Sequence, residues 1–196
     1  MEAAHEDSPL QNIHHTAFIA DTAALYGKIE IGEGSSVWFN AVIRCESHEV
    51  RIGRYTNLQD FGMIHIGYNH PTIIGDHCSI THRATIHGAT IGDACLIGIG
   101  ATVMDGAVIG AGSIVGGGAV VTEGKEFPAG SIILGAPAKA VKTRDNHRAN
   151  RLNAWLYHRN AQAYKVGDHR TWDGEEYERW RAEIRREIDA DEDLKR

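Results

Sequence analysis

The chain has 196 residues, enough for one substantial domain and an appendage. Its 42% hydrophobic and 23% charged residues are ordinary for a globular protein, and a net charge of −6 argues against a nucleic-acid partner. The sequence contains no apolar run of about 18 residues, so no membrane span is expected. The start MEAAHEDSPL lacks the apolar core of a secretory signal. The three cysteines follow neither a CxxC nor a disulfide pattern, so we expect a reducing, cytoplasmic setting.

Branched aliphatic residues recur every six positions along most of the chain. A first series runs from Ile13 to Ile43, and three further series follow after longer or shorter steps, ending at Val121. A small residue usually stands four places after each aliphatic, and an Ile-Gly-Asp/Glu turn signature recurs at 31–33, 74–76 and 91–93. A six-residue period fits neither an α-helix nor a simple alternating strand. It predicts a parallel β-helix of short strands and tight corners, with the aliphatic side chains pointing inward.

Three six-residue units make one triangular coil, and the irregular steps fall between groups of three. The spacing predicts roughly six coils, with loops near 46–50 and 67–71, and an all-β domain over residues 12–142. This pattern, closed by Gly135-Ala136-Pro137-Ala138-Lys139, resembles the hexapeptide-repeat superfamily. The resemblance implies a left-handed parallel β-helix, and many members of that superfamily are trimers.

The tail, residues 143–196, has a different pattern. Residues 146–166 place apolar side chains at helical spacing, and Asp173 followed by Glu176 is typical of a helix start. An apolar stripe follows, at Tyr177, Trp180, Ile184 and Ile188. We expect a C-terminal α-helical extension that packs along the β-helix or against a neighbouring subunit, with the stripe as packing surface rather than a membrane-binding face.

Three histidines occupy defined positions in this register. His65 and His87 follow inward isoleucines on the third face of consecutive coils, so both point outward and stack at the ~4.8 Å strand spacing. His82 lies at the corner that ends the second face, five residues and up to ~17 Å of extended chain from His87. A metal ion bound by all three therefore needs the His82 corner of a second copy. The alternative is that these are ordinary surface histidines, since the chain has 12.

Four short motifs around these histidines carry a more specific resemblance: Asn57-Leu58-Gln59-Asp60, Met63-Ile64-His65, Thr81-His82 and Ile86-His87-Gly88. Together they resemble the active-site signature of the γ-class carbonic anhydrases and their relatives. The resemblance implies that His65, His82 and His87 bind Zn²⁺, with Fe²⁺ or Co²⁺ as substitutes, between the subunits of a homotrimer.

Further residues surround the histidines. Arg44 follows Ile43 and shares the outward column of His65 and His87. The resemblance implies that Arg44 pairs with Glu46 across the subunit interface and that Gln59 hydrogen-bonds the metal-bound water. Asp60 shares the corner column of His82, which suits it to orient that ligand. The alternative for Arg44, Glu46 and Asp60 is a structural ion-pair network at the trimer contact, and the two roles are compatible.

The chain also departs from the family pattern. The family usually has Arg-Gly-Asp where Arg44-Cys45-Glu46 stands, and glycine where Phe61 and Thr81 stand. A Glu-rich loop that serves proton transfer in the family is missing. The loop at 67–71 carries His70 instead, which titrates in the range suited to a proton shuttle. We therefore expect Phe61 to narrow or reshape access to the metal, and the proton to leave by a route other than a Glu-rich loop.

Three neutral histidines leave the remaining positions of a zinc ion to water, as in catalytic sites. The resemblance implies a lyase in which zinc-bound hydroxide converts CO₂ to bicarbonate, with Gln59 orienting the hydroxide. We expect His70 or buffer to remove the proton. Two alternatives remain. One is an acyl-CoA thioesterase or acyltransferase on the same scaffold, with the metal water or a histidine acting on an acyl carbonyl. The other is a non-catalytic, carbonic-anhydrase-like scaffold, against which the three intact ligands argue.

Overall fold

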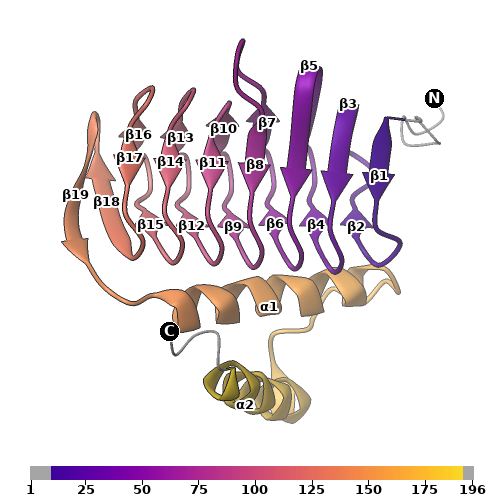
Figure 1. Ribbon diagram of the computed structural model, residues 1–196. Helices are drawn as coiled ribbons and strands as arrows, with labels where there is room; N and C mark the ends of the chain where they lie inside the picture. The colour runs from indigo at the N-terminus through magenta and orange to yellow at the C-terminus, as the bar shows by residue number, and fades with distance from the viewer. Residues whose placement is uncertain (1–9, 192–196) are drawn as a thin grey trace.

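A computed structural model describes residues 10–191, which form a parallel β-helix followed by two helices (Figure 1). Most of the segment MEAAHEDSPL and the last residues of the predicted 143–196 extension lie outside the described part of the chain. The β-helix has about seven turns, one more than the six-residue series indicate. The extra turn arises because Phe127 and Ile133 continue two of the inward columns beyond Val121.

The prism has three faces, here numbered in chain order. The first face is formed by β1 (Gln11–Ile13), the second halves of β3 (Ala24–Ile31) and β5 (Val42–Ile52), β8 (Thr72–Ile74), β11 (Thr90–Ile91), β14 (Val108–Ile109) and β17 (Glu126–Phe127). The second is formed by β2 (Phe18–Ile19), β4 (Ser36–Val37), β6 (Asn57–Leu58), β9 (Ser79–Ile80), β12 (Leu96–Ile97), β15 (Ile114–Val115) and β18 (Ser131–Gly135). The third is formed by the first halves of β3 and β5, with β7 (Met63–His65), β10 (Thr85–His87), β13 (Thr102–Val103) and β16 (Val120–Val121). The strand β19 (Ala138–Thr143) closes the end by pairing antiparallel with β18.

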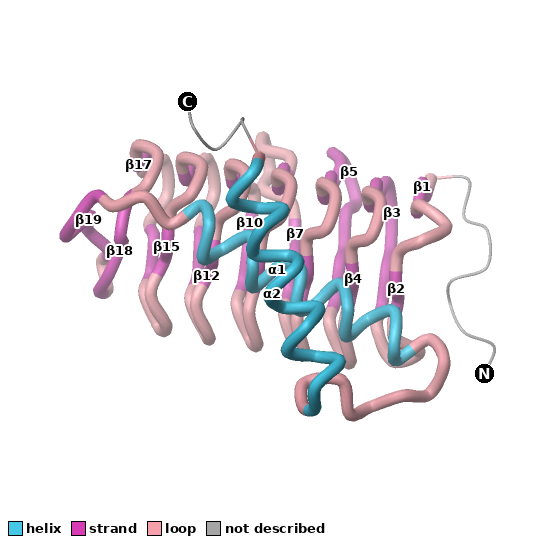
Figure 2. Tube along the Cα trace, turned by 90° about the horizontal axis from the view of Figure 1, so that it is seen from below, coloured by secondary structure: helices cyan, strands magenta, loops and turns pink. Residues whose placement is uncertain are grey.

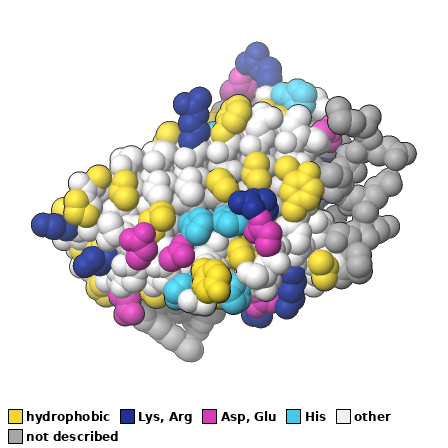
Figure 3. Space-filling view, turned by 90° about the horizontal axis from the view of Figure 1, so that it is seen from above, with side chains coloured by type: hydrophobic (Ala, Val, Ile, Leu, Met, Phe, Trp, Pro, Cys, Tyr) yellow, Lys and Arg dark blue, Asp and Glu magenta, His cyan; other side chains and the backbone are white. Residues whose placement is uncertain are grey.

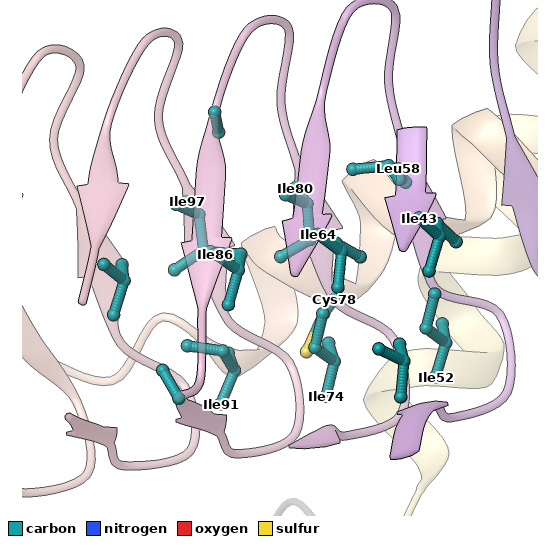
Figure 4. Close-up of a cluster of buried hydrophobic side chains, with 14 of the residues drawn as sticks. Ile43, Ile52, Leu58, Ile64, Ile74, Cys78, Ile80, Ile86, Ile91 and Ile97 are labelled. Carbon is teal, nitrogen blue, oxygen red and sulfur yellow. The ribbon is translucent and has the colours of Figure 1, made fainter. Parts of the chain in front are cut away.

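Stacked aliphatic side chains fill the interior, as the six-residue period predicts. On the third face Ile43 pairs in register with Ile64, which pairs with Ile86. All three are fully buried, and Figure 4 shows them among the inward side chains of the neighbouring faces. This burial of apolar surface is the main stabilising term of the prism. It also fixes the outward position of every residue that follows an inward aliphatic.

The strand β5 differs from the sequence expectation of a loop at 46–50. It runs unbroken from the third face to the first, and its register against β3 slips between the pairs Gly27–Cys45 and Ile29–Val50. One residue of β3 therefore opposes four of β5, which is a larger irregularity than the usual bulge of two residues against one. The bulge turns residues 46–49 outward from the edge of the third face. The second expected loop, at 67–71, is present between β7 and β8 and projects from the prism (Figure 1).

The helix α1 (His147–Tyr164) lies along the second face and runs back from the late turns to the first (Figures 1 and 2). Its polar side chains bond the corner carbonyls of successively earlier turns: Asn146 to Gly112, Asn150 to Ala94, His158 to Gly34, and Lys165 just beyond the helix to Thr16. Buried corner carbonyls that lack strand partners thus find donors in the helix. The predicted division of the chain at 142/143 stays a prediction, because α1 covers the prism closely.

The helix α2 (Gly174–Ala190) packs on α1 through Ile184 and Ile188, the buried half of the predicted stripe. Asp173 stands at the N-cap position, but its carboxylate pairs with Arg170 at 2.9 Å instead of capping the helix. Within residues 10–191, no helix is long and apolar enough to cross a membrane.

Candidate metal centre

His65 and His87 lie one above the other on the third face. They end β7 and β10 and are direct register partners. His65 Nδ1 and His87 Nε2 are 2.9 Å apart, and the ring centroids are 4.9 Å apart. In Figure 3 histidine side chains lie side by side on this surface, with basic and acidic side chains next to them. The register therefore brings together two of the three predicted ligands.

In each ring the nitrogen that points away from the other ring, here called the outer nitrogen, lies against a carboxylate. Glu46 Oε2 lies 2.8 Å from His65 Nε2, and Asp105 Oδ1 is in contact with His87 Nδ1. An ionised carboxylate only accepts hydrogen bonds, so in the neutral rings these outer nitrogens carry the hydrogens. The two inner nitrogens, His65 Nδ1 and His87 Nε2, then face each other with lone pairs. Such a pair repels unless a cation, either a proton or a metal ion, lies between them.

The surroundings of His65 disfavour the proton. Burial lowers the pKa of its imidazole below the ordinary value, and the positive charge of Arg44 and the neighbouring His87 lower it further. The neutral ring with a free lone pair is therefore the form present at neutral pH, and neutral imidazole is the form that binds metals.

The bulge of β5 positions Glu46. Arg44 is the register partner of His65 on the adjacent strand, and its guanidinium contacts the Glu46 carboxylate within the same chain. The pairing of Arg44 with Glu46 across a subunit interface stays a prediction. Glu46 thereby bridges Arg44 and His65, which holds the carboxylate against the imidazole. The neighbouring Cys45 thiol turns inward and contacts the His48 carbonyl at 3.1 Å.

His82 lies at the second corner, between the second and third faces. Asp60 stacks below it, since Arg83 N donates to Asp60 O and Gly100 N donates to His82 O. Asp60 Oδ2 lies 2.9 Å from His82 Nδ1, and the Tyr157 hydroxyl lies 3.4 Å from His82 Nε2. The carboxylate fixes the hydrogen on Nδ1 and leaves the Nε2 lone pair free.

Tyr157 lies on α1, and no motif of the sequence marks it as a site residue. Burial raises the pKa of its hydroxyl to about 12, and the Asp60 carboxylate adds to the rise. The hydroxyl therefore stays protonated and can donate to His82 Nε2 in the single chain, and a metal ion bound at Nε2 would replace this hydrogen bond. Asp105 was also not selected from the sequence. Its position could be read from the register, since it lies two residues after Val103, the partner of Ile86. The contact of Tyr157 depends instead on helix packing that the repeat does not encode.

Gln59 and His70 are the two remaining residues of the predicted site. Gln59 is buried on the second face, where its amide donates to Asn57 Oδ1 at 2.9 Å, so it contacts another amide rather than a histidine. His70 closes the 67–71 loop through its carbonyl, which accepts from Gly67 N at 2.8 Å. A Cβ added at Gly106 would lie 3.2 Å from His70 Nε2, so this ring stands beside the corner that carries Asp105.

The donor set fits zinc if two copies contribute. Within residues 10–191 of one chain, no three His, Cys, Asp or Glu side chains gather closely enough to hold a metal ion. A tetrahedral zinc with bonds of 2.0–2.1 Å separates two nitrogens by about 3.3 Å, slightly more than the spacing of the stacked pair. A small rotation of the two rings accommodates this. Each of the three imidazoles is already oriented by a carboxylate, the usual support of a zinc-binding histidine.

A cavity of about 630 Å³ borders His82 and is here called the His82 cavity. It lies between the second corner, α1 and the segment that joins α1 to α2. Aromatic and polar side chains line it: Trp38, Phe39, Asp60, His82, Tyr157, Asn160, Tyr164, His169, Arg170, Thr171, Trp172 and Asp173.

The chain is similar to a hexapeptide-repeat family and to proteins named as carbonic anhydrases. A family model described as bacterial transferase hexapeptide (six repeats) matches residues 88–123. A protein of Methanocaldococcus jannaschii named "Probable carbonic anhydrase" is 49% identical over 141 residues, which cover 71% of this chain and 89% of that protein. A carbonic anhydrase of Geobacillus kaustophilus is 42% identical over 153 residues, covering 77% of this chain and 84% of the relative.

Other similar proteins are longer or carry transferase descriptions. A mitochondrial γ carbonic anhydrase of Arabidopsis thaliana is 43% identical over 95 residues, 45% of this chain, and the match spans 34% of that protein. A solved structure from Bacillus cereus, described as a candidate acetyltransferase, superposes with a TM-score of 0.77 at 34% identity, covering 80% of this chain and 92% of the other. A hexapeptide transferase family protein from Anaplasma phagocytophilum gives 0.75 at 31% identity, covering 79% and 92%.

Proposed function

The chain belongs to the γ-class carbonic anhydrase and carbonic-anhydrase-like family of hexapeptide-repeat proteins, and on that premise we propose that it hydrates CO₂ to bicarbonate at a zinc site shared by subunits of a homotrimer. The observation that carries the proposal is the close approach of His65 Nδ1 and His87 Nε2, which are 2.9 Å apart. Their outer nitrogens are held by carboxylates, so the inner ones are free to take a cation.

In this proposal His65 and His87 of one copy and His82 of a second copy hold the metal. Zinc lowers the pKa of a bound water to ~7 and so supplies a nucleophile near neutral pH. Asp105 and Asp60 orient the imidazoles of His87 and His82 and keep each in the tautomer whose Nε2 lone pair is free. Fe²⁺ and Co²⁺ are compatible with the same nitrogen donors.

The residues around the ligands position and move protons. Tyr157 keeps its proton at neutral pH and offers a donor beside His82. His70 stands next to the Asp105 corner, exposed to solvent, and is proposed to pass a proton to buffer. Gln59 is proposed to orient the bound water, which requires its amide to turn from Asn57.

A direct test combines metal analysis with catalysis. Purified protein should carry one zinc per subunit, give an anomalous signal at the meeting point of His65, His87 and His82, and hydrate CO₂ in a stopped-flow indicator assay. His65→Ala, His82→Ala and His87→Ala should each abolish both zinc binding and activity while circular dichroism stays unchanged. A trimer that is fully loaded with zinc yet hydrates CO₂ no faster than buffer disproves the proposed reaction.

An acyl-transfer reaction is the second candidate. The His82 cavity, about 630 Å³, is far larger than CO₂ requires, and the two solved structures above carry transferase descriptions. In this case a histidine or the metal would promote attack on an acyl carbonyl. Release of free CoA from an acyl-CoA, measured with a thiol reagent, would favour acyl transfer over CO₂ hydration.

The cytoplasm remains the proposed setting of the protein, on the cysteine pattern alone.

A further inference from the structure

The two parts of the candidate metal site lie at opposite ends of the third face. His65 and His87 end their strands just before the third corner, where the chain turns onto the first face. His82 lies at the second corner, before β10 begins. If His82 of a second copy joins His65 and His87, the third corner of one copy must lie against the second corner of the next. The inference below rests on this proposed arrangement.

The third corner carries the 67–71 loop, and this loop displays Tyr68. Its side chain is 90% exposed, the most exposed of the large hydrophobic side chains among residues 10–191. The backbone beneath it is held on both sides, because Gly67 N donates to His70 O at 2.8 Å and His48 Nε2 donates to Tyr68 O at 3.0 Å. A tyrosine three residues from His65 is thus presented outward on an ordered loop.

The second corner offers a complementary hollow. The His82 cavity has aromatic walls, including Trp38, Tyr157 and the half-exposed Trp172, with Asp60 at its rim. Tyrosine favours a site of this kind, since its ring packs against aromatic faces while its hydroxyl reaches a polar group. The 67–71 loop contains no carboxylate, so it brings no like charge against Asp60.

We propose that Tyr68 of one copy inserts into the His82 cavity of the neighbouring copy and closes the solvent side of the shared metal site. The copy that supplies His65 and His87 then also supplies Tyr68, and the neighbouring copy supplies His82 and the cavity that receives the tyrosine. A buried aromatic anchor in a pocket is the type of residue that dominates interface energetics.

Cross-linking tests the insertion. The three native cysteines are buried, so a short bismaleimide should react only with introduced thiols. The double variant Tyr68→Cys/Arg170→Cys, with Arg170 at the cavity rim, should give covalent dimers and trimers on a denaturing gel. The control Tyr68→Cys/Arg148→Cys places the second thiol at the other end of α1, beside a different cavity, and should give monomers.

The outcomes separate this inference from the proposed function. If a zinc-binding trimer gives no covalent dimers and trimers, or gives them equally in both variants, the result overturns the insertion of Tyr68 but not the proposed metal site. Covalent products specific to Arg170→Cys in a trimer without zinc sustain the insertion and overturn the metal site. A protein that stays monomeric overturns both.

A second measurement does not depend on cross-linking geometry. Tyr68→Ala should raise the dissociation constant of the trimer about tenfold or more, whereas Tyr68→Phe, which keeps the ring, should change it little. Both variants should fold normally, because the side chain is exposed in the single chain. Equal dissociation constants for the wild type and Tyr68→Ala contradict the inference. So does a small aromatic molecule that co-purifies in the cavity of the assembled protein.

Discussion

At the residue scale, the candidate centre consists of imidazoles whose tautomers are fixed by carboxylates. Asp60 bonds His82 Nδ1 at 2.9 Å, and Asp105 contacts His87 Nδ1. Neither carboxylate is needed for the aliphatic core, since both stand on the outside of corners. Their contribution to a metal site is therefore separable from their contribution to the fold.

Asp60→Asn tests this separation. The amide cannot act as a charged acceptor, so the orientation and basicity of the His82 ring weaken. We expect the zinc affinity to fall ~10- to 100-fold, with little change in the free energy of unfolding of the metal-free protein. Competition with a chromogenic chelator measures the affinity.

Asp105→Asn should lower the zinc affinity in the same way through His87, whereas Asp21→Asn, an exposed carboxyl on the first turn, should not. If all three variants bind zinc as tightly as the wild type does, the carboxylates do not serve the proposed ligands.

At the scale of the elements, each short strand contributes one inward side chain. Ile64→Ala removes a fully buried side chain between Ile43 and Ile86. The cavity should lower the free energy of unfolding by about 2–5 kcal/mol. Urea unfolding at fixed protein concentration measures the loss. Thr85→Ala, an outward position on the neighbouring strand, is the matched control and should cost less than about 1 kcal/mol.

The packing of α1 predicts that the stability of the fold depends on pH. His77, at the corner between the first and second faces, stacks on Tyr55 and lies beside Trp155 of α1. Burial lowers its pKa from 6.5 to about 4, and the charge of Arg151 contributes. The fold therefore requires the neutral ring, so this stability is complete above pH 6.5 and is lost as the pH falls toward 4. The loss reaches at most about 3 kcal/mol.

Unfolding at pH 7.5 and pH 4.5 measures this loss. His77→Asn removes the titrating ring, and asparagine tolerates the left-handed backbone at this position, where φ is 56°. The variant should lose less stability on acidification than the wild type does. Some dependence should remain, because burial also lowers the pKa of His158. Identical losses in the two proteins contradict the assignment to His77.

The six-residue repeat predicts the strands that obey its register, but it does not predict the segments that depart from that register. The columns through Ile31, Val37 and Ile43 match the structure because each inward aliphatic must meet the one above it. The stacking of His65 on His87 follows from the same constraint. The bulge of β5 does not, since extra residues can loop outward without disturbing the core. The position of Tyr157 depends on how α1 docks, which no period in the chain encodes.

At the scale of the whole molecule, the proposed ligands make metal binding and association one equilibrium. His65 and His87 lie on one copy, and His82 is held apart from them by its contacts with Asp60 and Tyr157. A metal ion bound by all three therefore stabilises the assembled form only, and mass action requires that it shift assembly. Zinc should lower the apparent dissociation constant of the trimer, and a chelator should raise it.

Sedimentation at several protein concentrations, with zinc and with chelator, measures this coupling. At free zinc of about 100 times its Kd, each site adds about 2.7 kcal/mol to the assembled state. His82→Ala should remove the zinc response, because it deletes the only ligand proposed to come from the second copy, while any contact made by Tyr68 remains. His70→Ala changes an exposed histidine outside the ligand set and should keep the full response. An assembly equilibrium that zinc leaves unchanged in the wild type contradicts a site shared between copies, even if each chain still binds zinc through His65 and His87.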